Sequence, residues 1–73
     1  MSLENELAQF QAELKAEEQN LAKFEAMEIV EDENNPFSIE ERIEARERGI
    51  RSTKESIEEI KEIIEEIKEE MSG

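Results

Sequence analysis

Apolar side chains recur every three or four residues through the second half of the chain and form one stripe on a charged background. The stripe comprises Ile39, Ile43, Ile50, Ile57, Ile60, Ile64, Ile67 and Met71. Arg46 and Thr53 occupy the two positions that the pattern skips. An apolar stripe of period 3.5 is typical of a coiled-coil helix. It predicts a helix over residues 38–71 that needs a partner to cover its stripe.

The first part of the chain carries the same repeat and predicts a second helix over residues 3–28. Its stripe comprises Leu3, Leu7, Phe10, Leu14, Leu21 and Phe24, with Glu17 in the remaining position. Residues 29–37 are acidic and contain Pro36, which predicts a turn. Ser38, followed by Glu41, has the pattern of a helix N-cap. We therefore expect an all-α fold over residues 1–73, namely a two-helix antiparallel coiled-coil hairpin that self-associates into a helical bundle.

The heptad positions suggest a pairing of the two helices. Placing Phe24 opposite Ile43 gives layers in which position a of one helix faces position d of the other. The intra-hairpin core then comprises Leu7, Phe10, Leu14, Leu21, Phe24, Ile43, Ile50 and Ile57. In this pairing Glu17 and Arg46 fall in adjacent layers, where they either form an ion pair that fixes the register or reach out to water.

The same pairing leaves the end of the second helix without a partner inside the hairpin. The apolar face there is wider than a two-helix seam, and it comprises Ile60, Ile63, Ile64, Ile67 and Met71. A chain of 73 residues without cysteine or histidine has neither disulfides nor a usual zinc site to stabilise it. We therefore expect these five residues to form an oligomer interface with another copy, as a dimer or higher assembly.

The charge distribution limits which molecules, apart from another copy of the chain, are expected to bind. The net charge is -13. Residues 1–38 contain ten acids and two bases, residues 39–54 contain four acids and five bases, and residues 55–73 contain eight acids and two bases. Such a field opposes binding to nucleic acid or an anionic membrane. The N-terminal residues lack the apolar run of a signal peptide, and we expect a cytoplasmic protein.

No residue pattern indicates catalysis, a cofactor or a metal. The run from Asp32 to Asn35 begins like a calcium loop, but Pro36 and Phe37 replace the next ligand and the required glycine. We expect a non-enzymatic interaction or assembly module that binds itself and another protein. Small acidic hairpins resemble, in general style, phage assembly or accessory proteins and bacterial adaptor subunits. The alternatives are an acidic nucleic-acid mimic that inhibits a DNA- or RNA-binding protein, and a fragment of a longer coiled-coil protein.

Overall fold

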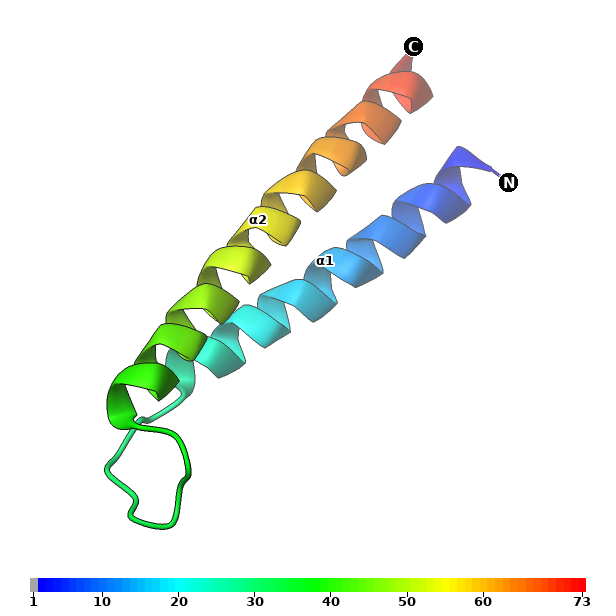
Figure 1. Cartoon of the computed structure of the whole chain (residues 1–73). Helices are drawn as coiled ribbons and strands as arrows, with labels where there is room; N and C mark the ends of the chain where they lie inside the picture. Colours follow the sequence, from blue (N-terminus) through cyan, green and yellow to red (C-terminus); the bar gives the residue numbers. More distant parts are fainter. Residues whose placement is uncertain (1) are drawn as a thin grey trace.

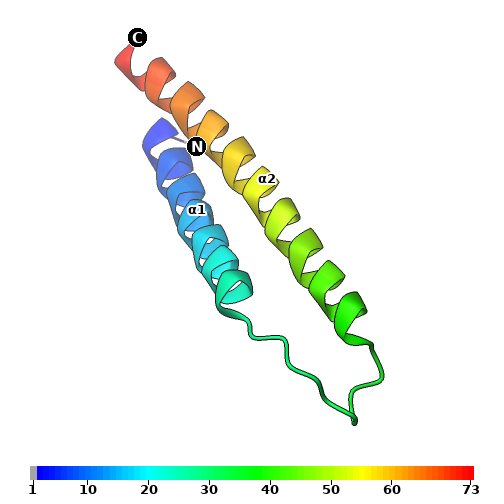
Figure 2. The same cartoon turned by 90° about the vertical axis from the view of Figure 1, so that its left-hand side faces the viewer.

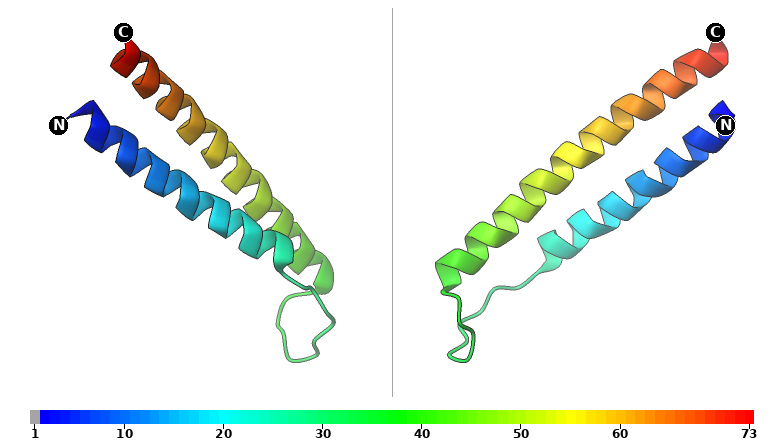
Figure 3. Two further views of the ribbon diagram at one scale, coloured as in Figure 1. Left: turned by 180° about the vertical axis from the view of Figure 1, so that it is seen from behind. Right: turned by 45° about the vertical axis from the view of Figure 1, so that its right-hand side comes forward.

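A computed structural model describes residues 2–73 and shows two antiparallel helices, α1 (Leu3–Ala26) and α2 (Ile39–Ser72). The helices lie side by side, and the connection closes one end while both termini lie at the other (Figures 1 and 2). The views from behind and from the side show the same elongated pair, whose Cα extents are 58 × 17 × 15 Å (Figure 3). The predicted all-α helical hairpin is confirmed, with α1 ending at residue 26 instead of 28.

Both helices begin at a serine whose side chain caps the first turn. The hydroxyl oxygen of Ser2 accepts a hydrogen bond from the Asn5 amide at 3.1 Å, and that of Ser38 accepts one from the Glu41 amide at 3.2 Å. Each bond satisfies a backbone donor that has no partner within its helix. The predicted N-cap at Ser38 is confirmed.

Among residues 2–73, the buried side chains all belong to α2. Thr53, Ile57, Ile64 and Ile67 are buried, whereas α1 contains no buried residue. The Thr53 hydroxyl donates a 2.7 Å hydrogen bond to the Gly49 carbonyl, which lets this polar group lie in an apolar seam. The central seam residues of α2 are therefore buried, whereas those of α1 remain partly exposed to solvent.

The observed register differs from the predicted one by one heptad. The Phe24 ring packs against Gly49, the neighbour of Ile50, and not against Ile43. Towards the other end, Phe10 shares a surface depression with Ile67. The predicted pairing of Phe24 with Ile43 is therefore wrong, and the part of α2 that extends beyond α1 is its N-terminal end, beside the connection.

Arg46 helps to hold the observed register. Its Nε donates a 2.8 Å hydrogen bond to the Phe24 carbonyl, and its Nη2 donates a 3.0 Å bond to the Glu25 carbonyl. These carbonyls belong to the last turn of α1, where the Phe24 carbonyl also accepts a 3.3 Å hydrogen bond from the Met27 amide and the helix dipole favours a cation. A side chain of α2 thus caps the C-terminus of α1 and fixes where the two helices meet.

Gly49 allows the close contact with Phe24, and we predict that Gly49→Ala destabilises the hairpin. An alanine Cβ would lie 2.6 Å from Phe24 Cε1 and 2.7 Å from Cζ. Helix propensity alone would make this substitution stabilising by ~1 kcal/mol, but overpacking costs ~1–3 kcal/mol. We expect a net loss of about 1 kcal/mol in urea unfolding.

The control for Gly49→Ala is the same substitution in a Phe24→Leu background. The shorter side chain removes the steric conflict, so the substitution should there be neutral or stabilising. A stabilising effect of Gly49→Ala in the native sequence would contradict the observed packing.

Candidate interaction surface

The five residues predicted as an oligomer interface have different surroundings in the hairpin. Ile64 and Ile67 are buried within the single chain, Ile60 and Ile63 are partly exposed, and Met71 is 43% exposed. The heptad shift explains this result, because α1 reaches as far as the C-terminal part of α2. The prediction that Ile67 lacks a partner inside the hairpin is therefore wrong, and Ile64 is buried without a second copy as well, whereas Ile60, Ile63 and Met71 remain available to another copy.

Of the eight residues predicted as the intra-hairpin core, one is buried. Ile57 is buried, and six further members are partly exposed along the seam: Leu7, Phe10, Leu14, Leu21, Phe24 and Ile50. Ile43 is 40% exposed because it lies on the part of α2 that extends beyond α1. The same heptad shift thus places Ile43 outside the core.

The structure does not bring Glu17 and Arg46 together as a register pair. Arg46 donates to backbone carbonyls at the end of α1. Glu17 lies near the middle of α1, where its carboxylate accepts a 3.4 Å hydrogen bond from Asn20, and it borders a depression with Ile60. Arg46 does help to set the register, but it does so by capping a helix.

Exposed apolar side chains gather around the connection, which sequence reasoning treated only as a turn. Met27 is 48% exposed, Val30 63% and Phe37 59%, and Ile43 follows on the first turns of α2. The signal was the presence of four large apolar residues, Met27, Ile29, Val30 and Phe37, in an otherwise acidic linker. Among the described residues, four of the five exposed large apolar side chains belong to this end of the hairpin.

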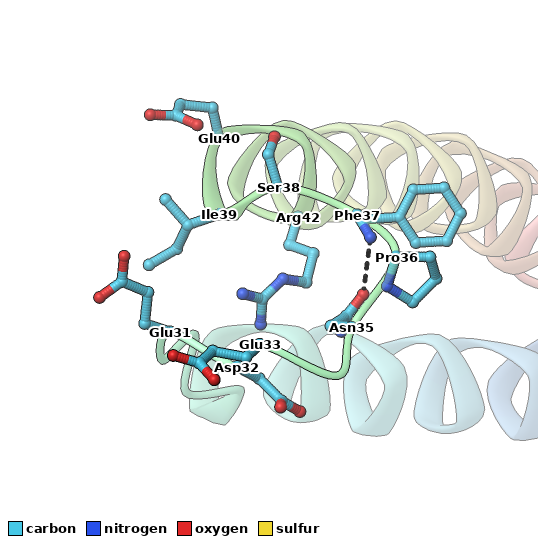
Figure 4. Close-up of a pocket in the computed structure, with 10 residues that line it drawn as sticks. All are labelled: Glu31, Asp32, Glu33, Asn35, Pro36, Phe37, Ser38, Ile39, Glu40 and Arg42. Carbon is cyan, nitrogen blue, oxygen red and sulfur yellow. Dashed lines mark hydrogen bonds between the residues drawn. The ribbon is translucent and has the colours of Figure 1, made fainter.

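The connection itself is folded by short polar turns. Asp32 Oδ1 accepts from the Asn34 amide at 3.0 Å, and Asn35 Oδ1 accepts from the Phe37 amide at 2.9 Å. The Arg42 side chain points into the ring that these turns form, while the Phe37 ring points outward (Figure 4). Arg42 Nε is buried there without a hydrogen-bond partner. The oxygens that resemble calcium ligands in the sequence are thus used as turn-forming acceptors.

One long side of the hairpin, here called the open face, is hollowed between the helices. Two depressions of about 370 and 330 Å³ lie along it, and each is lined by side chains of both α1 and α2. The residues that line them are Glu6, Phe10, Glu13, Ala16 and Glu17 on α1, and Ser56, Glu59, Ile60, Ile63, Glu66, Ile67 and Glu70 on α2. The open face therefore exposes part of the apolar seam beside carboxylates.

The described residues contain neither a group of metal ligands nor a membrane-spanning helix. Within residues 2–73 no group of three or more histidine, cysteine, aspartate or glutamate side chains is placed to hold a metal ion. Across the same residues, neither helix has the length and apolar character required to cross a membrane.

The fold and surfaces define an acidic helical hairpin with an incompletely covered seam. No protein-family model, curated protein or solved structure matches the chain.

Proposed function

We propose that this protein is a non-enzymatic interaction or assembly module that acts by homo-oligomerising through its helices in the manner of a coiled coil. The observation that carries this proposal is that α1 contains no buried residue. Leu7, Leu14 and Leu21 have a helix beside them and still remain partly exposed. A further helical surface is what would complete their burial.

The small size of the hairpin supports the same proposal. A single core in a chain this short rarely supplies more than ~3–5 kcal/mol, and the part of the chain that the structure describes buries only three apolar residues, Ile57, Ile64 and Ile67. Burying apolar area against a second copy adds roughly 25 cal/mol per Å². Association would therefore strengthen a fold whose own core is small.

We predict that Ile63→Glu lowers the oligomeric state while leaving the helices in place. Ile63 is partly exposed on the open face, so a carboxylate there reaches water in the free hairpin but would be desolvated in an interface. Sedimentation equilibrium should give a dimer or larger species for the native chain and a monomer for the variant. Far-ultraviolet circular dichroism should show that helix content is retained at low temperature.

The matched control is Ile43→Glu, which makes the same chemical change at an exposed residue beyond the end of α1. This variant should keep the native mass. A native chain that sediments as a folded monomer would overturn homo-oligomerisation as the function.

A further inference from the structure

We infer that residues 27–31, here called the linker segment, add as a strand to an exposed sheet edge of a partner protein whose edge carries basic side chains. The inference concerns the connection and does not rest on self-association of the helices. It assigns the hairpin a second surface, at the connection end, for a partner with a different fold.

The linker segment is an extended run with unpaired backbone groups. Met27 has φ of -65° and ψ of 124°, and neither a turn nor a bend interrupts residues 27–32. In Figure 2 this run leads from the end of α1 to the tip of the connection. Within residues 2–73, the amides and carbonyls of residues 28–31 make no hydrogen bond to the rest of the chain. Free donors and acceptors in an extended chain are what a sheet edge recognises.

The linker segment is held at both ends. At its start the Met27 amide donates a 3.3 Å hydrogen bond to the Phe24 carbonyl, and just past its end the Asn35 amide donates a 3.1 Å bond to the Asp32 carbonyl. These bonds limit the conformational freedom that the segment would lose on pairing. Its length is that of a typical strand, about five to six residues.

The apolar side chains of the linker segment are accessible to a partner. Met27 is 48% exposed and Val30 63%, and Ile29 is partly exposed. Successive side chains of a strand point to opposite faces, so Met27 and Ile29 share one face and Val30 lies on the other. Each face of the added strand would therefore bring an apolar side chain to the partner.

Charge selects the kind of sheet edge. Exposed carboxylates lie within and directly after the linker segment, and residues 27–41 contain no base. Sheet edges of soluble proteins commonly carry lysine, which keeps them from pairing with one another. Opposite charges that face each other across two strands attract instead. The linker segment therefore suits an edge that its own basic side chains protect from other edges.

A second copy of the hairpin does not fit this role. The described residues form helices and no strand, so a second copy could offer only its own linker segment. That pairing would set like charges opposite one another. A partner helix is equally unsuited, because its internal backbone groups are already hydrogen-bonded.

The test uses a cyclic β-hairpin peptide whose strands alternate lysine and valine, since it presents a preformed basic edge. When this lysine peptide is added, amide hydrogen exchange measured by NMR should slow several-fold at alternate residues, either Glu28 and Val30 or Ile29 and Glu31. Alternation is expected because one edge of a strand presents every second amide. A control peptide with glutamate in place of lysine should leave these exchange rates unchanged.

Two matched variants locate the site. Val30→Ser combined with Glu31→Gln removes one exposed apolar side chain and one charge from the linker segment, and it should weaken calorimetric binding of the lysine peptide about tenfold. Met71→Ser combined with Glu70→Gln makes equivalent changes at the other end of the hairpin and should leave the affinity unchanged. Equal weakening by both variants, no binding, or exchange that slows without alternation would overturn the inference.

Ile63→Glu keeps this inference distinct from the proposed function. That variant tests self-association and does not alter the linker segment, so it should bind the lysine peptide as the native chain does. A monomeric native chain that binds the peptide would refute homo-oligomerisation alone. An oligomeric chain that fails to bind it would refute the strand addition alone.

Discussion

Ile64→Ala should lower the free energy of unfolding by about 2–4 kcal/mol and leave the chain largely unfolded at 25 °C. Ile64 is among the most buried side chains of the hairpin, at 6% exposure. Its truncation removes apolar burial and leaves a cavity, for which ~2–5 kcal/mol is typical. Since a chain of this size has ~3–5 kcal/mol of stability, the loss approaches the total. Urea unfolding followed by circular dichroism, at one fixed protein concentration, measures it.

Ile43→Ala is the matched comparison, since it removes the same atoms from the same heptad position. Ile43 is 40% exposed beyond the end of α1, so we expect a loss of less than about 1 kcal/mol. The register inferred from sequence placed Ile43 in the core and Ile64 in the oligomer interface. Equal losses for the two variants would contradict the observed register.

Arg46→Met should destabilise the hairpin by about 1–2 kcal/mol, although it places an apolar residue in an apolar stripe. If Arg46 simply interrupted a seam, methionine would complete the heptad pattern and stabilise the fold. In the structure, the guanidinium group donates two hydrogen bonds to the last turn of α1, at 2.8 and 3.0 Å. Hydrogen bonds from a charged donor contribute ~1.5–3 kcal/mol each, and partial exposure at this site reduces that value.

Arg48→Met provides the control for the loss of a positive charge from an acidic chain. Arg48 is exposed on the same part of α2, and we expect a change within ~0.5 kcal/mol. Thermal unfolding of the three proteins should place Arg46→Met clearly below the others. A melting temperature for Arg46→Met above that of the native chain would show that the capping bonds contribute little.

The fold class could be predicted because the apolar repeat, the two serine caps and the turn around Pro36 all agree. The register could not, because a shift of one full heptad keeps every a position opposite a d position. Heptad positions alone do not distinguish the two registers. The fit of Phe24 against Gly49 also depends on three-dimensional shape, which heptad counting ignores.

The predicted oligomer interface also depended on the wrong helix register. Ile67 was assigned to another copy because the inferred register left it unpaired, and Ile64 because the apolar face there is wider than a two-helix seam. The exposed apolar residues at the connection, such as Val30 and Phe37, were missed because they follow no helical period. The open face is defined only when the two helices are placed side by side.

The contact between Arg46 and the end of α1 also has a consequence for the order of folding. The guanidinium group reaches a carbonyl 22 residues earlier in the chain. During synthesis α1 therefore emerges without the two hydrogen bonds that Arg46 donates to its last turn, and short isolated helices are marginal in water. The cap forms only once the first two turns of α2 have wound and the connection has closed. Completion of α1 thus waits for its partner, which makes the two helices one cooperative unit rather than two segments that melt separately.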